Sequence, residues 1–282
     1  ENSKEAYWSG NSNPSGKEEK IPYWIEQCNL SANDMAIFWI KVPFLENNTN
    51  TTVYLYYGNP SASSESNGTA VFEFFDDFDD GEIDTNKWQK VLSGVTESGG
   101  YLRLLHSDDV YGGDIFSIKT FSLPFILEYK WKAGMADVGE YVGMQSTTDP
   151  SNWVATSGVD WIIGFRFYRG SANGGSDAWI FNTVKDGSKT ETGAGTADNN
   201  WHEIKIVATS NSVKFYSDNS LVQEHTTNIP DSPLYICADH KLYSGTDVES
   251  LVDNIFIRKY ASPEPSIASI GEEQAVTSTD SN

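Results

Sequence analysis

The chain has 282 residues, of which 40 are Asp or Glu and 19 are Lys or Arg, so its formal net charge is −21. This balance excludes broad basic surfaces of the kind that bind nucleic-acid phosphates or anionic lipids, and it favours cations such as calcium. Aromatic residues make up 13% of the chain, which excludes an acidic disordered protein and is enough for a packed core.

Residues 1–70 predict a small β-rich domain. The segments 36–42 (AIFWIKV) and 52–57 (TVYLYY) alternate apolar residues and predict a pair of strands, joined by the polar stretch 46–51. Glycosylation sequons (Asn-x-Ser/Thr) occur at Asn29, Asn47, Asn50 and Asn67. Their clustering indicates either glycosylation of an exported protein or a loop region that is merely rich in Asn and Thr.

The two cysteines, Cys28 and Cys237, lie far apart in the chain. No Cys-x-x-Cys pair and no Cys/His cluster with the spacing of a zinc site occurs. In an exported protein the two thiols would form a disulfide between the early segment and the last strands. Two unbridged, buried thiols are the alternative.

Residues 71–262 predict a second, larger domain built from short strands. Period-two apolar segments with Gly, Asn, Asp and Ser between them recur about every ten residues, which is typical of an antiparallel β-sandwich. Tight turns are expected at Lys185-Asp186-Gly187 and at Asp218-Asn219. Residues 263–282 are polar and lack a core-forming pattern, so we expect a tail or linker there. No apolar run is long enough to span a membrane.

Four blocks within about residues 15–80 resemble the domain of unknown function 2341: residues 21–26 (IPYWIE), 39–43 (WIKVP), 53–60 (VYLYYGNP) and 72–78 (FEFFDDF). The family has no assigned activity. The resemblance implies an exported archaeal or bacterial protein joined to β-sandwich modules. The family usually has further strands before the first block, whereas about twenty polar residues precede it here. The first domain is therefore expected to lack its first strands and to leave an open sheet edge.

The ends of the second domain are similar to concanavalin A-like jelly rolls, the lectin/glucanase and laminin-G-like group. Residues 75–88 (FDDFDDGEIDTNKW) resemble the opening of that fold and residues 251–260 (LVDNIFIRKY) resemble its closing strand. The resemblance implies an all-β antiparallel sandwich over residues 71–262.

Seven acidic residues and no basic residue lie between Glu73 and Asp84. In the jelly-roll group a structural calcium often links the opening segment to the closing strand. The resemblance places its ligands at Asp77, Asp79 and Asp253, with a carbonyl near Gly99-Gly100. The alternative is a solvated acidic turn without metal.

The sequence motifs of known catalytic sites are missing. Glucanases of this fold carry a Glu-x-Asp-x-x-Glu strand, and no such spacing occurs; His-Glu-x-x-His and Gly-x-Ser-x-Gly are also absent. A carboxylate pair assembled from separate strands would escape this search. Because these motifs are absent, we expect no enzymatic activity.

The middle strands are rich in residues that contact sugars, by ring stacking and by hydrogen bonds to hydroxyl groups. The set comprises Tyr141, Gln145, Trp153, Trp161, Arg166, Tyr168, Trp179 and Asn182. In the segment 161–168, Phe165 and Phe167 are the better core candidates. Arg166, Tyr168 and Trp179 are therefore predicted to bind carbohydrate; alternatively, these aromatic residues only fill the sandwich.

The first expectation for function is an extracellular or cell-surface protein with a non-catalytic carbohydrate-binding or adhesive jelly-roll module. The alternative is a structural subunit of an extracellular filament or surface assembly, held by strand donation. A glycoside-active enzyme is the third. The expected cofactor is structural calcium. The expected partners are glycans or copies of the chain in a homo-oligomer or filament, and neither nucleic acid binding nor membrane insertion is expected.

Overall fold

The computed structural model describes residues 5–9, 19–29, 35–59, 61, 63–90, 94–105, 115–134, 137–149, 157–168, 178–244 and 249–274. The chain divides into two compact units, one formed by Glu1–Val71 with Ala261–Asn282 and the other by Phe72–Tyr260. The polar segment after residue 262 thus groups with the first unit, whereas the sequence set it apart as a tail.

The first unit contains a three-stranded sheet in the order β2-β1-β5 and a separate hairpin of β3 and β4. Their bounds are β1 Glu5–Ser9, β2 Glu19–Ile21, β3 Tyr23–Asn29, β4 Met35–Ile40 and β5 Thr52–Tyr56, and the short helix α1 spans Gly68–Val71. Its small core is formed by the buried Ile21 and Tyr23, with Ile25, Phe38 and Val53 packed against them.

The predicted pairing of the two early strands is wrong. Both segments form strands, but β4 pairs with β3 and β5 pairs with β1. The reason is that β1 lies within the first twenty residues, whose overall polarity concealed a strand. Ala6 and Tyr7 lie opposite Leu55 and Tyr54, so this strand supplies β5 with its partner.

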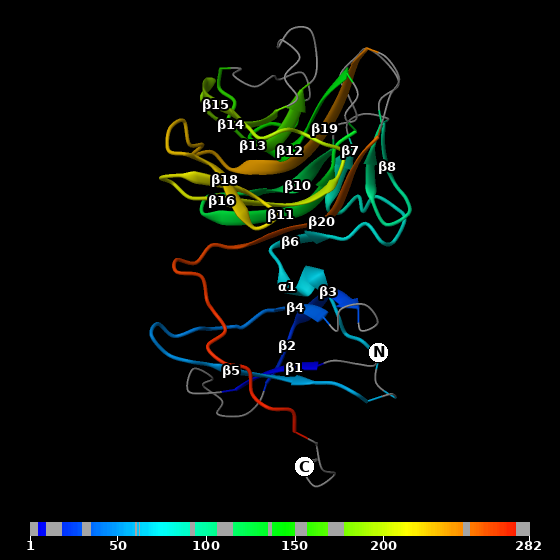
Figure 1. Ribbon diagram of the computed structural model, residues 1–282, viewed down its shortest axis with the longest axis vertical. Coiled ribbons are helices and arrows are strands. Elements are labelled where there is room, and N and C mark those ends of the chain that lie inside the picture. Colours follow the sequence, from blue (N-terminus) through cyan, green and yellow to red (C-terminus); the bar gives the residue numbers. More distant parts are fainter. Residues whose placement is uncertain are drawn as a thin grey trace. The chain divides into compact units, whose positions relative to one another are not determined.

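The second unit is a sandwich of two antiparallel sheets, which confirms the predicted fold class (Figure 1). In sheet order, the seven-stranded sheet consists of β15 Ser188–Ala194, β14 Trp179–Lys185, β13 Trp161–Tyr168, β12 Asp137–Gln145, β19 Leu234–Ser244, β10 Ile115–Phe121 and β7 Trp88–Lys90.

The eight-stranded sheet runs in the order β18 Ser220–His225, β17 Val213–Ser217, β16 Trp201–Ala208, β11 Phe125–Lys132, β20 Ser250–Lys259, β9 Leu102–Leu104 and β8 Val95–Glu97. Its eighth strand, β6 Phe74–Asp76, pairs with β20. The first and last strands of the unit are therefore hydrogen-bonded neighbours, as the resemblance to jelly rolls implies.

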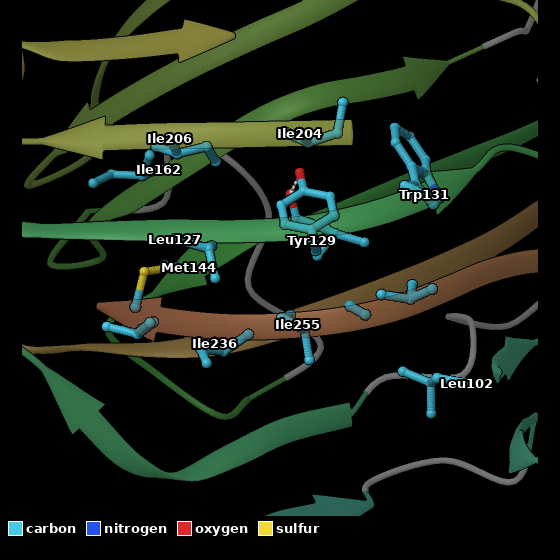
Figure 2. Packing of buried hydrophobic residues seen from close by; sticks show 14 of the residues in the cluster. Leu102, Leu127, Tyr129, Trp131, Met144, Ile162, Ile204, Ile206, Ile236 and Ile255 are labelled. Atoms are coloured by element: carbon cyan, nitrogen blue, oxygen red, sulfur yellow. Dashed lines mark hydrogen bonds between the residues drawn. The ribbon is translucent and has the colours of Figure 1, made fainter. Parts of the chain in front are cut away.

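The core fills the space between the two sheets and follows from the alternation of each strand. Leu127, Tyr129 and Trp131 of β11 point inward, while the residues between them face outward (Figure 2). The buried Tyr129 hydroxyl lies 3.1 Å from the Val142 carbonyl oxygen and 3.3 Å from that of Gly164. This polar group of β11 is thereby hydrogen-bonded to the opposite sheet instead of being buried without a partner.

Both predicted tight turns are present. Asp186 and Gly187 have φ values of 47° and 75° between β14 and β15, and Asp218 and Asn219 have 49° and 63° between β17 and β18. Two successive positive φ values characterise the two-residue turns that match the twist of a hairpin. The turn at Asp186 sets the register in which Asn182 lies opposite Glu191.

Candidate functional site

Three buried polar side chains lie in a row on the outer face of the seven-stranded sheet, the face turned away from the core. Gln145 of β12 lies directly opposite Trp161 of β13, and Asn182 of β14 lies opposite Ile163, two residues further along β13. Directly paired residues and residues two apart share a face. We call Gln145, Trp161 and Asn182 the polar row.

Each residue of the polar row has one buried atom without a hydrogen-bond partner. These atoms are Gln145 Oε1, Trp161 Nε1 and Asn182 Oδ1. The three side chains are between 0% and 2% exposed. A buried polar group without a partner costs about 1–3 kcal/mol, so such groups are rare outside functional sites. Two acceptors and one donor on one sheet face match the hydrogen-bonding capacity of hydroxyl groups.

The other polar atoms of the row are held in place by the protein. Gln145 Nε2 donates to the Thr147 carbonyl oxygen at 2.7 Å, and Asn182 Nδ2 donates to Glu191 Oε2 at 2.9 Å. Trp161 packs against Val159 and Val184, and its ring meets Tyr141 edge-on with centroids 5.7 Å apart. The orientation of each side chain is thus fixed by protein contacts.

Glu191 is the carboxylate beside the polar row. It lies on β15 with its side chain 38% exposed, where it accepts the hydrogen bond from Asn182 and pairs with Lys189 Nζ at 2.9 Å. Asp239 of β19 is a second carboxylate on the same face, opposite Tyr141. Four strand spacings separate β15 from β19, or about 19 Å at ~4.8 Å per strand. Glycoside hydrolysis by two carboxylates needs a separation of roughly 5–9.5 Å, so these two are not a catalytic pair.

Asp160, which directly precedes β13, acts as a structural anchor. It is 4% exposed and accepts hydrogen bonds from the Asp186 amide at 2.8 Å and from the Ser232 hydroxyl at 2.7 Å, with longer bonds from the amides of Asp231 and Ser232. Burial alone would raise the pKa of this carboxyl, but the hydrogen bonds outweigh it and lower the pKa. These hydrogen bonds tie two loops to the start of β13.

A Ser, a His and a Glu meet in the core without forming a nucleophilic triad. His240 Nδ1 is 3.0 Å from Ser250 Oγ and 3.4 Å from Glu140 Oε2, and all three residues are fully buried. In a triad the serine and the acid occupy different ring nitrogens, whereas both are at Nδ1 here. The Gly134 amide also reaches Glu140 Oε2, at 3.0 Å. This cluster links the two sheets and has no access for a substrate.

Of the three predicted carbohydrate-binding residues, Trp179 is the one whose side chain the structure describes. Trp179 faces the core, where it is 6% exposed and its ring lies 5.3 Å from that of Trp131, so its prediction as a surface contact is corrected. Its neighbour Asn182, three positions later, is on the outer face instead. Arg166 and Tyr168 belong to β13, but their side chains lie outside the described residues.

The predicted calcium ligands Asp77, Asp79 and Asp253 share one neighbourhood on the second unit. Burial raises the pKa of Asp253 to about 6, opposed by Lys130 and reinforced by the charges of Asp79 and Asp77. Burial and the charge of Asp79 likewise raise the pKa of Asp77. The Gly99-Gly100 backbone approaches the same place, since a Cβ on Gly100 would lie 3.1 Å from Asp79 Oδ1.

These residues fit a hard cation in kind, because carboxylate and carbonyl oxygens are the ligands that calcium prefers. In the part of the chain that the structure describes, however, no three acidic, His or Cys side chains gather closely enough to enclose a metal ion. The calcium site therefore stays a prediction, which Asp77, Asp79 and Asp253 support by their proximity.

The remaining predicted sites are distributed over both units. Cys28 is exposed on β3 of the first unit and Cys237 is buried on β19 of the second, and no disulfide joins them. Of the sequons, Asn47, Asn50 and Asn67 are exposed, while the side chain of Asn29 lies outside the described residues. Asn67 Oδ1 also accepts the Ala70 amide at 3.1 Å at the start of α1. Occupancy of the sequons stays a prediction. No helix among the described residues has the length and apolarity to cross a bilayer.

Sequence reasoning named Gln145, Trp161 and Asn182 only within a wider set of middle-strand residues. The missing information was the register, which decides whether a residue faces the core or the outside. A usable local signal was present in β14: Asn182 is an amide between the inward-facing Phe181 and Thr183.

Comparisons with known proteins agree with both resemblances. Residues 14–91 match the family described as a domain of unknown function, DUF2341. Among solved structures, the Bacillus licheniformis β-glucanase matches with a TM-score of 0.53 and 19% identity over 66% of this chain and 98% of that chain. The laminarinase from Flavobacterium sp. UMI-01 matches with a TM-score of 0.52 and 15% identity over 67% of this chain and 100% of that chain. The Pyrococcus furiosus endo-β-1,3-glucanase matches with a TM-score of 0.52 and 12% identity over 66% of this chain and 93% of that chain. A comparison with curated proteins found no match.

These structural neighbours overturn the function that the sequence placed first. A non-catalytic binding or adhesive module, with a strand-donated filament subunit as its alternative, was expected. The similar solved structures include glucanases and related glycoside hydrolases, among them an endo-β-1,3(4)-glucanase from family GH16. At these identities the likeness shows the fold alone, and what the chain does with a glycan is a matter for proposal.

Proposed function

We propose that the jelly-roll unit is a carbohydrate-active domain of the glycoside hydrolase type, which takes up a polysaccharide on the outer face of its seven-stranded sheet. The observation that carries the proposal is the polar row: three buried polar atoms without partners on one face of this fold. Sugar hydroxyls donate and accept hydrogen bonds, so the hydroxyls of a bound glycan can supply the donors that Gln145 Oε1 and Asn182 Oδ1 lack and the acceptor that Trp161 Nε1 lacks.

Aromatic and acidic residues around the polar row support the same function. Tyr141 borders Trp161 and is partly exposed, which gives a sugar ring an apolar face to stack on. Glu191 is exposed next to Asn182 and is the carboxylate that a bound chain would meet. This proposal replaces the expectation of no enzymatic activity, because the missing Glu-x-Asp-x-x-Glu motif concerns only carboxylates on one strand. A two-carboxylate mechanism needs a second carboxylate beside Glu191, and Asp239 is too distant to serve as this partner.

The test is a polysaccharide assay with paired variants. Mixed-linkage β-1,3-1,4-glucan, laminarin, porphyran and mucin O-glycans are the substrates to compare, because proteins that share the fold are named for acting on them. Gln145→Met and Asn182→Leu should each reduce binding and release of reducing ends by about tenfold, the equivalent of ~1.4 kcal/mol. Each removes one unpaired oxygen together with one hydrogen bond already made, so stability should change by less than about 1 kcal/mol.

The control is Tyr216→Leu on the eight-stranded sheet, where Tyr216 packs under Lys205. This variant should leave both readouts unchanged. Binding without release of reducing ends would overturn the hydrolytic part of the proposal. Absence of binding to every polysaccharide, or equal losses in the control, would overturn the site itself.

The calcium that the sequence predicts is proposed as a structural element of the same unit. Asp77 and Asp79 from the opening segment and Asp253 from β20 would hold it, together with backbone oxygens near Gly99-Gly100. The cation would neutralise the charge of Asp79, which, after burial, raises the pKa of both Asp77 and Asp253. Its role would be to join the two ends of the unit, remote from the polar row.

A further inference from the structure

His225 joins the two sheets at the edge of the sandwich where β15 and β18 come together. The ring is 2% exposed and lies on β18, opposite Val213 of the core. Its Nδ1 is 3.1 Å from Thr183 Oγ1 on β14, and its Nε2 is 2.7 Å from Thr192 Oγ1 on β15. One imidazole of the eight-stranded sheet thus binds two adjacent strands of the other sheet.

The hydrogen-bond network determines which nitrogen of the ring carries the proton. Thr183 Oγ1 donates its only hydrogen to the Thr227 carbonyl oxygen at 3.0 Å, so it accepts from His225 Nδ1–H. Nε2 of the neutral ring then accepts the hydroxyl hydrogen of Thr192. A second proton on Nε2 would leave the Thr192 hydroxyl hydrogen without its acceptor and would place a charge between the sheets.

No carboxylate compensates such a charge among the described residues around the ring. Phe215 meets it edge-on with centroids 5.4 Å apart, its hydrogen-bond partners are the hydroxyl groups of Thr183 and Thr192, and Val213 lies opposite it in the sheet. The charged residues of the adjoining strands, Lys189, Glu191, Lys214 and Glu224, occupy the outward-facing positions, where they pair with one another. Burial therefore lowers the pKa of His225 without an opposing charge.

The same strands carry the candidate glycan site on their opposite face. Thr183 follows Asn182 on β14, and Thr192 follows Glu191 on β15, so each threonine that binds His225 adjoins a residue of the outer face. Thr190 continues the connection, with its Oγ1 2.7 Å from Thr227 Oγ1 and accepting Asn228 Nδ2 at 3.0 Å. Release of the threonines would free the segment that orients Glu191 towards Asn182.

We propose that His225 is a positioning residue that holds β14 and β15 against β18 while it is neutral, and that its protonation releases this edge of the sandwich. The release is a property of the fold, and only its effect on glycan uptake through Asn182 and Glu191 rests on the proposed function. The pKa of His225 is lower in the folded protein than in the unfolded chain, where it is about 6.5. The neutral ring therefore contributes its full stabilisation of the fold above about pH 6.5, and this stabilisation is lost as the pH falls below that value.

The experiment measures hydrogen exchange of the β15 and β18 amides at pH 7.5 and pH 5.0, corrected for intrinsic rates. In the wild-type chain the opening of these strands should increase at least about threefold at the lower pH, with a ceiling of about tenfold per pH unit. The central strands β11 and β20 should show no such increase in opening at pH 5.0. His225→Gln keeps a donor and an acceptor without titrating and should abolish the increase.

The matched control is His202→Gln in the same sheet. His202 lies between Asp198 at 3.1 Å and Asp218 at 2.8 Å, and these hydrogen bonds raise its pKa against the opposing effect of burial. This variant should retain the acid-dependent opening of β15 and β18. An unchanged increase in His225→Gln, or its loss in His202→Gln, would overturn the proposal.

An NMR titration of the wild-type imidazoles covers the case in which His225→Gln does not fold. His225 should titrate below about 6.5, and the β15 amides should shift over the same pH range. Titration at or above that value, or titration without a β15 response, would overturn the proposal. None of these measurements needs a glycan, so the proposed function can fail while the release at His225 holds. If glycan binding does not change with pH while β15 opens, only the proposed effect of the release on glycan uptake is overturned.

Discussion

Glu97 shows how a single residue sets the acid–base behaviour of the acidic segment. It is 8% exposed on β8, and its Oε1 accepts the Gly81 amide at 2.9 Å. Burial, and then a hydrogen bond with the Asp80 carboxylate, raise its pKa to about 7. Asp80, which accepts the Glu82 amide, has its pKa lowered. The shared proton therefore resides on Glu97, and two carboxyl groups lie together without repelling each other.

Glu97→Gln should stabilise the protein at alkaline pH. The favourable protonated form of Glu97 is fully present below the unfolded pKa of about 4.5 and is lost as the pH rises through about 7. Glutamine keeps the donor and the acceptor at every pH, so the variant should gain about 1–2 kcal/mol over wild type at pH 8 and nearly nothing at pH 5. Urea unfolding at both pH values, in a chelating buffer, measures the gain. The matched control Glu224→Gln, at an exposed position of β18, should show no such gain at pH 8. Equal unfolding curves for wild type and Glu97→Gln would refute the assignment.

Strand β13 illustrates what an element contributes in the middle of a sheet. Its outward side chain Trp161 belongs to the polar row, while Ile162 and Gly164 face the core. A Cβ on Gly164 would lie 3.0 Å from both Ile206 Cδ1 and Phe215 Cδ1 of the opposite sheet. The absence of a side chain at this position thus allows the two sheets to approach each other beneath the candidate site.

Gly164→Ala should therefore destabilise the jelly-roll unit by about 1–3 kcal/mol, as overpacking of a filled core does. Gly271→Ala is the matched control, because nothing lies within 4 Å of a Cβ at that position, and it should change stability by less than about 0.5 kcal/mol. Thermal unfolding of both variants gives the comparison. If Gly164→Ala is as stable as the control, the close approach of the two sheets at β13 is not a constraint.

At the scale of the whole molecule, the second unit closes on itself through its two ends. Asp76 and Phe75 of β6 lie opposite Ile255 and Phe256 of β20. Asp76 is anchored there by Trp88 Nε1, which donates to its Oδ2 at 2.6 Å, and by Lys87 at 3.3 Å. This closure brings Asp77 and Asp79 near Asp253, residues that are separated by more than half of the chain.

Calcium at these three residues should raise the melting temperature of the unit relative to the protein in a chelator. Free calcium at 100 times its dissociation constant would add about 2.7 kcal/mol to the free energy of unfolding. For a domain of this size, this corresponds to an increase in melting temperature of about 5–10 °C. Asp253→Asn should abolish the increase and, in the chelator, be at least as stable as wild type because repulsion with Asp77 and Asp79 is relieved. Asp231→Asn, whose side chain pairs with Lys185, should keep the increase. Identical melting temperatures with calcium and with chelator would refute the site.

The amino-acid sequence determined by itself those features that depend on neighbours in the chain. Period-two alternation and the turns at Asp186 and Asp218 identified antiparallel strands. Residues 75–88 and 251–260 identified the two ends of the jelly roll, and residues 14–91 match the family that the early blocks resembled. Local backbone preference and side-chain spacing are enough for these conclusions.

Only the tertiary structure decided which strands pair and which face of each strand is buried. It paired β5 with β1 instead of β4, turned Trp179 into the core, and aligned Gln145, Trp161 and Asn182 on one outer face. The physical reason is that pairing and register are set by contacts between residues distant in sequence. A shift of one residue in a strand would turn every side chain to the opposite face without changing the local pattern.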